Sequence, residues 1–253
     1  MLSRHYIGKI PPEDFILEVQ KGNVPGHSLL IKFGKNLDID TITDPEYIWD
    51  TGGTYTFPLA ADTLDIASTG VDNSAGTGAR SITVQGLDAN HKELSIDVTL
   101  TGGTVTTTQT FFRVFRAFVK TAGTGEINAS DITITHNGAG TPEVARILAE
   151  KGQTQMAIYT VPAGKTAYLK YWSGAILKRS TGSAELQFWE RSNSGVKRLK
   201  SSLGINAGGT TTINKEFGFR PIEEKTDIYI ICAEVSDSNS AVFSNFTLLL
   251  VDN

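Results

Sequence analysis

The chain has 253 residues, of which 40% are hydrophobic, and a formal net charge of −4. This length allows one large or two smaller domains, and this apolar content is enough for a packed core. A mildly acidic chain does not suit a nucleic-acid coat or a polybasic membrane binder. We therefore expect a folded protein that binds neither nucleic acid nor a membrane.

A single cysteine, Cys232, limits the chemistry further. One cysteine excludes an intrachain disulfide and a cysteine-based metal cluster, and the surrounding run IYIICAEV predicts a buried thiol. The N-terminus lacks the apolar stretch of a signal peptide, and no run approaches the roughly 18 apolar residues that span a bilayer. We expect a protein that is made in a cytoplasm and stays soluble.

Residues 1–45 follow no single period, because prolines and glycines interrupt their short apolar runs. Such a segment cannot bury its apolar side chains by itself, so we predict an extended N-terminal arm. The arm could lie along its own domain or along a neighbouring subunit, and the sequence favours neither. Its predicted anchors, in either case, are Phe15, Ile16, Leu29, Leu30 and Phe33.

From about Ile48 onward apolar and polar residues alternate, as in Leu64 and Ile66 or Ile82 and Val84. Alternation with period two is typical of strands that have one face in a core and one in water. Turns rich in Gly, Asn and Asp separate these runs. We therefore predict a first β domain over residues 46–145.

Two segments near the end of this domain are ambiguous. The run at 111–119, FFRVFRAFV, fits both a helical stripe and a strand, and its preceding threonines favour the strand. The run at 142–150, PEVARILAE, is a candidate for a short helix.

Residues 146–253 predict a second β domain, whose most apolar part is the hairpin at 154–178. About seven strands are expected here, and the run at 228–235 is apolar on both faces, as in a central strand. The sequence therefore predicts an all-β protein of antiparallel β-sandwiches with a jelly-roll-like C-terminal domain.

Two tryptophans are candidate contact residues. Trp189 falls on the polar face of its predicted strand, and Trp172 has the same strand parity as Tyr168 and Lys170. A tryptophan that points outward is often covered by a loop, a neighbouring subunit or a sugar. We therefore expect Trp172 and Trp189 to lie at an interface, with intrachain cover and carbohydrate stacking as the alternatives.

Motifs for catalysis or cofactor binding are not supported. Gly164-Lys165-Thr166 is similar to the end of a phosphate-binding loop, but Tyr159 occupies the position of the required first glycine. The four histidines lack metal-ligand spacing, and no GxSxG motif is present. We expect no catalytic residue, no cofactor and no metal, and therefore no enzyme.

Several runs, taken together, resemble a known family. They are GHSLLIKFGKNLDIDT, IWDTGGTYTFP, GTGARSITVQGLD, FRVFRAFV and MAIYTVPAGKTAYL. They resemble virion structural proteins of tailed bacteriophages, in particular podovirus-like phages of aquatic bacteria. The resemblance covers approximately residues 22–175, and it concerns these runs as a whole and not active-site motifs.

The resemblance implies a virion component that is assembled in the host cytoplasm. The role it favours is a capsid decoration or cement protein that binds the major capsid protein or other virion proteins. A homo-oligomer, with a trimer favoured, would bury the extra aromatic surface. The alternatives are a tail, collar or fibre-base component and a carbohydrate-binding module. On the arm hypothesis, a chain without its first 40 residues still folds but no longer binds shells.

Overall fold

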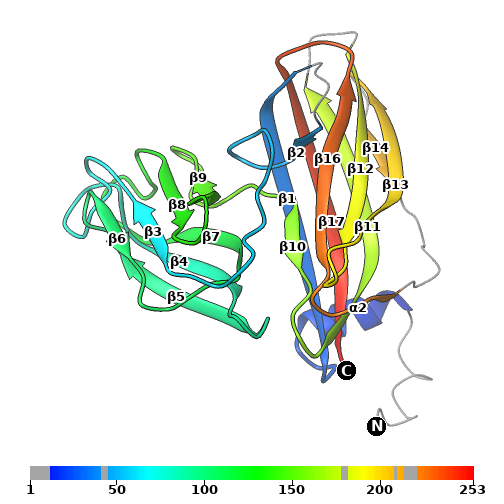
Figure 1. The fold of residues 1–253 in the computed structure, drawn as a ribbon, viewed down its shortest axis with the longest axis horizontal. Coiled ribbons are helices and arrows are strands. Elements are labelled where there is room, and N and C mark those ends of the chain that lie inside the picture. The colour runs from blue at the N-terminus through cyan, green and yellow to red at the C-terminus, as the bar shows by residue number, and fades with distance from the viewer. Residues whose placement is uncertain (1–11, 41–44, 178–181, 208–209, 214–220) are drawn as a thin grey trace.

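The computed structural model describes residues 12–40, 45–177, 182–207, 210–213 and 221–253 (Figure 1). Within these ranges the chain has one helix, α2 (Pro12–Gln20), and is otherwise nearly all strand and turn. The strand pairs recorded there are all antiparallel. The prediction of an all-β protein with antiparallel sheets is confirmed.

The strands form two lobes, of which the larger is a two-sheet sandwich (Figure 1). Its strands are β1 (His27–Ile39), β2 (Glu46–Tyr47), β10 (Ile158–Thr160), β11 (Lys165–Leu177), β12 (Ser183–Arg191), β13 (Lys197–Asn206), β14 (Thr210–Ile213), β15 (Pro221–Ile222), β16 (Asp227–Val235) and β17 (Ser240–Asp252). Sheet A has the order β1-β17-β11-β14, with β15 beside β11. Sheet B has the order β10-β16-β12-β13, with β2 beside β16.

The order of the sandwich strands interleaves early and late parts of the chain. Without the two-residue strands β2 and β15, and numbered from one to eight along the chain, the sheets have the orders 1-8-3-6 and 2-7-4-5. The first and last strands are therefore neighbours, in a ladder that includes His27 opposite Val251 and Asn36 opposite Val242. The two sheets enclose one apolar core, with Trp172, Phe188 and Phe246 at its centre.

The described part of residues 1–45 is a helix and a strand rather than the extended arm that we expected. The strand β1 lies in sheet A, and α2 packs on the outer face of that sheet through Val19, together with Val24 of the segment that follows the helix. The sequence concealed β1 because three of its buried positions hold Lys32, Gly34 and Asn36 instead of apolar side chains. Removing the first 40 residues would remove β1 from its ladder with β17, so this structure gives no support to the expectation that the truncated chain folds.

The smaller lobe, here called the inserted lobe, lies between β2 and β10 in the chain. Its strands are β3 (Leu64–Ala67), β4 (Ala79–Leu87), β5 (Glu93–Thr99), β6 (Thr104–Thr106), β7 (Arg113–Ala122), β8 (Ile132–His136) and β9 (Glu143–Ile147). They form the sheets β6-β3-β8-β9 and β5-β4-β7. The alternating residues Leu64, Ile66, Ile82 and Val84 are all buried in its core, as the sequence predicted.

The two ambiguous segments are both strands. Most of the run at 111–119 lies in β7, as favoured. The helix expected at 142–150 is wrong, because residues 143–147 form β9 and pair with β8. The run VARI satisfies a strand period as well as a helical one, and tertiary pairing decides between the two.

The inserted lobe is attached to sheet B along one edge of β16. Both β10 and β2 pair with β16, at 227–229 and 231–232, while β12 occupies its other edge. The outer face of β16 packs against aromatic residues that lead into the lobe, and the rings of Tyr47 and Tyr229 stack at 5.1 Å. Burial of β16 on both faces explains its run of apolar residues, which the sequence assigned to a central strand.

We expect Gly34→Ala to lower the free energy of unfolding by about 3 kcal/mol. An added Cβ would lie 2.3 Å from the backbone nitrogen of Ala157 and 2.3 Å from the carbonyl oxygen of Ile48. Gly204→Ala on β13 is the control, since its Cβ would meet nothing within 4 Å. Urea denaturation measures both variants, and equal losses would contradict the close approach at Gly34.

Candidate functional site

The outer face of sheet A has an exposed apolar patch on β1. Ile31, Phe33 and Leu37 are 61%, 39% and 51% exposed, and we call these three residues the open β1 patch. Phe243 of β17 continues the face beside them, with the Lys35 ammonium 4.8 Å from its ring centre. Helix α2 lies against the same sheet near the start of β1 (Figure 1). The three side chains of the patch remain accessible.

Of the five predicted arm anchors, only Phe33 belongs to this patch. Phe15 packs edge-on against His27, with ring centres 5.8 Å apart, and Leu29 joins the small cluster under α2. Leu30 packs against the sandwich core, and Ile16 on α2 is half-buried. Ile31 and Leu37 were not among the predicted anchors, although the run LLIKFGKNL contains them at strand spacing.

Trp172 is not at an interface in this structure, because it is fully buried in the sandwich core. Its indole nitrogen donates to Ser244 Oγ at 3.0 Å, and its ring packs edge-on against Phe188. The prediction that Trp172 shares a face with Tyr168 and Lys170 is wrong, because a bulge between Leu169 and Tyr171 shifts the register of β11 against β17. One extra residue moves every later side chain to the opposite face.

Trp189 does lie on the outer face of sheet B, but its own chain covers part of it. It packs against the aromatic cluster that leads into the inserted lobe, and its indole nitrogen donates to Gln187 Oε1 at 3.0 Å. Intrachain cover, one of the alternatives in the sequence analysis, therefore accounts for this tryptophan.

A buried ion cluster joins the inserted lobe to the sandwich. Asp227 Oδ1 accepts hydrogen bonds from Arg113 Nε at 2.9 Å and from Thr160 Oγ1 at 2.6 Å. Asp227 Oδ2 accepts from Arg191 Nη2 at 2.5 Å, and the Arg191 guanidinium lies 4.2 Å from the ring centre of Phe57. One carboxylate thus holds two guanidinium groups from different lobes, which fixes their relative position.

We expect Asp227→Asn to lower the free energy of unfolding by about 3–5 kcal/mol, because it leaves two buried guanidinium groups without their carboxylate. Asp97→Asn is the matched control, since the pair of Asp97 with Lys120 is half exposed and is screened by water, so its loss should change stability little. Chemical denaturation of both variants tests the difference. A loss at Asp227 as small as that at Asp97 would show that the buried cluster does not hold the lobes together.

A second buried pair of titratable groups lies where β1 meets the inserted lobe. The Lys32 ammonium donates to the carbonyl oxygen of Phe115, and burial, reinforced by Arg116, lowers its pKa to about 7. Burial also raises the pKa of Asp50 to about 7, although Oδ2 accepts a hydrogen bond from the Gln155 amide. Asp50 Oδ1 is buried without a hydrogen-bond partner among the described residues. Both charges therefore destabilise the junction near neutral pH.

We expect the stability difference between Lys32→Met and the unchanged chain to depend on pH. The pKa of Lys32 is about 7 in the fold against 10.5 in an unperturbed lysine, so the unfolded chain binds more protons between these values. The penalty of burying Lys32 is therefore complete below pH 7 and disappears as the pH rises toward 10.5. The relative stability of the variant should fall over this range.

Unfolding measured at pH 6, 8 and 10 tests this expectation, with Lys35→Met on the same strand as the control. A difference between Lys32→Met and the unchanged chain that is constant with pH would contradict it.

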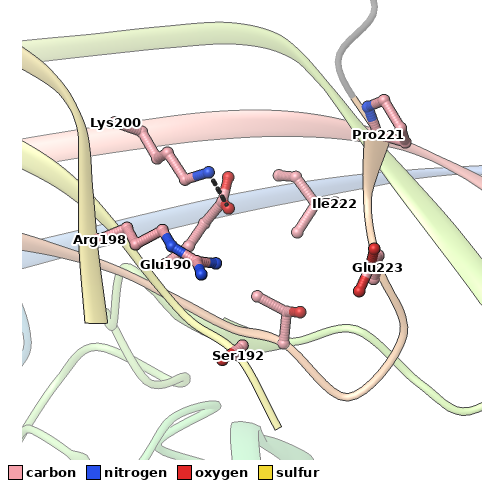
Figure 2. A pocket seen from close by; sticks show the side chains of 8 residues that line it. Glu190, Ser192, Arg198, Lys200, Pro221, Ile222 and Glu223 are labelled. Carbon is pink, nitrogen blue, oxygen red and sulfur yellow. Dashed lines mark ion pairs between the residues drawn. The ribbon is translucent and has the colours of Figure 1, made fainter. Parts of the chain in front are cut away.

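A small polar cavity lies between β12, β13 and the segment before β16 (Figure 2). It has a volume of about 280 Å³ and is lined by Glu190, Ser192, Arg198, Lys200, Pro221, Ile222, Glu223 and Thr226. Lys200 pairs with Glu190 at 2.7 Å, and the two basic and two acidic side chains balance in formal charge. The cavity therefore lacks the positive field that a phosphate site needs.

The described ranges also contain no group of three His, Cys, Asp or Glu side chains placed to hold a metal ion. Burial raises the pKa of Cys232 to about 12, and this thiol is buried as the sequence predicted. Among the described helices there is none long and apolar enough to cross a membrane.

Comparison with known proteins adds little to this geometry. No protein-family model and no curated protein matches the chain. The chain is similar to a solved structure of infectious bursal disease virus, Gx strain, with 11% identity, 90% of this chain and 73% of that chain covered, and a TM-score of 0.24. It is similar to the PBSX exported protein XepA, with 12% identity, coverage of 87% and 84%, and a TM-score of 0.19.

A structure of the Gt strain of the same virus is similar at 11% identity, with coverage of 94% and 82% and a TM-score of 0.19. TM-scores this low do not indicate a shared fold, so functional inference depends on the residues of this chain.

Proposed function

We propose that this chain is a non-enzymatic structural protein of a phage virion, and specifically a capsid decoration or cement protein that binds and stabilises the shell. The observation that carries the proposal is the open β1 patch. Ile31, Phe33 and Leu37 expose large apolar side chains on one face of one strand, where a protein without a partner would gain by burying them. A protein surface of suitable shape would cover them.

The order of the sandwich strands supports the same proposal. The orders 1-8-3-6 and 2-7-4-5 suit a jelly roll, in which eight strands fold into two facing sheets. Jelly rolls occur in viral capsid proteins, and also in lectins and cupins, so a fold does not choose a function by itself. The resemblance of several runs to virion proteins of tailed phages favours the capsid among these uses.

In the proposed assembly, the open β1 patch contacts the major capsid protein or another virion protein. The chain forms a homo-oligomer, with a trimer favoured, because a closed symmetric ring buries apolar surface without leaving open ends. Assembly takes place in the host cytoplasm. A tail, collar or fibre-base position is the alternative, and the number of copies in a purified particle separates the two. Hundreds of copies per particle support a position in the head. A copy number equal to the subunits of one or a few symmetric rings supports a position in the tail.

We expect the double variant Ile31→Asp with Phe33→Asp to fold normally but to bind shells at least about tenfold more weakly. Both side chains are exposed, so the charges cost little in the free chain, but two buried carboxylates would be costly in an apolar contact. Leu59→Asp is the matched control, because Leu59 is 89% exposed and belongs to the segment between β2 and β3, outside the open β1 patch.

Cosedimentation with shells that lack the protein measures binding, and a thermal melt checks folding. If the double variant binds as strongly as the Leu59→Asp control, the open β1 patch is not the contact surface.

A further inference from the structure

The turn after β8 contains the sole Asn–Gly pair of the sequence, Asn137-Gly138. Glycine has no Cβ, so the backbone nitrogen that follows such an asparagine is unusually open to the asparagine side chain. That nitrogen can attack the side-chain amide carbon when a base removes its proton. The structure places a base at this nitrogen.

The base is the imidazole of His136, which is 1% exposed. Its Nε2 lies 2.9 Å from the carbonyl oxygen of Phe111, and its Nδ1 lies 3.0 Å from the backbone nitrogen of Gly138. A carbonyl oxygen only accepts hydrogen bonds, so Nε2 carries the proton and donates it. Since the Gly138 N–H also donates, Nδ1 presents its lone pair to that hydrogen.

The neighbouring strand β3 and Thr63, the residue before it, hold this geometry in place. Asn137 Nδ2 donates to Thr63 Oγ1 at 3.0 Å and to Asp65 Oδ1 at 3.1 Å, and the Asn137 backbone nitrogen donates to the Thr63 carbonyl oxygen. A Cβ at position 138 would lie 2.7 Å from the His136 ring, so only glycine allows the imidazole to approach this closely. Base and nucleophile are thus fixed before any reaction begins.

We propose that Asn137 is a self-modification site at which the folded chain promotes its own deamidation, with His136 as the general base. His136 Nδ1 takes the amide proton of Gly138, and a bond forms between the Gly138 nitrogen and Asn137 Cγ. The bond between Cγ and Nδ2 then breaks, and the amide nitrogen leaves as ammonia with that proton. Water opens the resulting succinimide at either carbonyl, which leaves aspartate or isoaspartate at position 137. The net reaction consumes one water and releases one ammonia.

The product would change the packing of the inserted lobe. In the unmodified chain Asn137 donates to the Asp65 carboxylate, and hydrogen bonds from Thr106 and then Asn137 lower the pKa of Asp65. After deamidation a carboxylate replaces that donor, so two negative groups face each other. The modification therefore weakens the attachment of the β8–β9 turn to β3. The fraction of modified chains increases with the time since synthesis.

Peptide mapping by mass spectrometry tests the proposal on the full chain. The folded protein and a synthetic peptide of residues 132–143 are incubated together at pH 7.5 and 37 °C, and the conversion of Asn137 is followed in each. We expect conversion at least about tenfold faster in the folded chain, because a positioned general base acts only there. Conversion that is equally fast or slower in the folded chain would overturn the proposal, since the fold would then protect Asn137.

His136→Gln tests the base itself, because the glutamine amide can occupy a similar volume but cannot take the proton. With a melting temperature close to that of the unchanged chain, this variant should convert at the rate of the peptide. An unchanged rate would remove His136 from the reaction. Where His136→Gln does not fold, the comparison of the unchanged chain with the peptide decides alone. Asn73 in the Asn–Ser pair of the same lobe serves as the internal reference, since the backbone nitrogen of Ser74 donates to the carbonyl oxygen of Leu100 and not to an imidazole.

Discussion

The ladder between β1 and β17 is the interaction on which the rest of the structure depends. It joins the two ends of the sandwich, brings β1 against the backbone of Ile48 and Ala157, and provides the surface on which α2 packs. The two strands are separated by almost the whole sequence. The chain between them must therefore lose conformational entropy before the contacts of the ladder can form. The same strand carries the open β1 patch, so the proposed contact surface depends on this closure as well.

Buried polar groups fix the junction of the two lobes. The cluster around Asp227 and the single hydrogen bond of Lys32 both cross from the sandwich to the inserted lobe. Removing these charges from water is costly, and a well-packed apolar contact could hold two lobes at least as strongly. The ion cluster adds a preferred relative orientation, because a guanidinium and a carboxylate bind best in one geometry. The apolar cluster that runs from the lobe to β16 supplies burial at this junction, and the ion cluster adds a preferred orientation of the two lobes.

The sequence reveals the strands whose buried faces are apolar, and conceals those whose buried faces are not. Leu64, Ile66, Ile82 and Val84 alternate as their burial requires, and β16 has the apolar run of a strand covered on both faces. In β1 polar and apolar residues occupy the opposite positions, with Lys32 buried and Ile31 exposed. The sequence therefore predicts an arm where the structure has a strand.

The site could be predicted only in part, for similar reasons. Phe33 was recognised as an anchor, but a bulge that no local pattern announces turns Trp172 into the core. The contact of Asp227 with Arg113 links residues 114 positions apart, and no period connects them. Strand order depends on pairing between residues that are far apart in the chain. The sequence could therefore predict the presence of the sheets but not the order of the strands in them.

The attachment of the inserted lobe has a mechanical consequence. Its entry strand β2 has two residues and its exit strand β10 has three, and both lie along the same edge of β16. A force that pulls on the lobe therefore loads these few strand pairs, the Asp227 cluster and the hydrogen bond from Lys32 of β1 to the Phe115 carbonyl oxygen, whereas the long ladder of β11 with β17 includes no strand of the lobe. Because these contacts are shorter than the ladders of sheet A, we expect them to break under load before sheet A opens. The short strands β2 and β10 are therefore the part of sheet B that we expect to separate first.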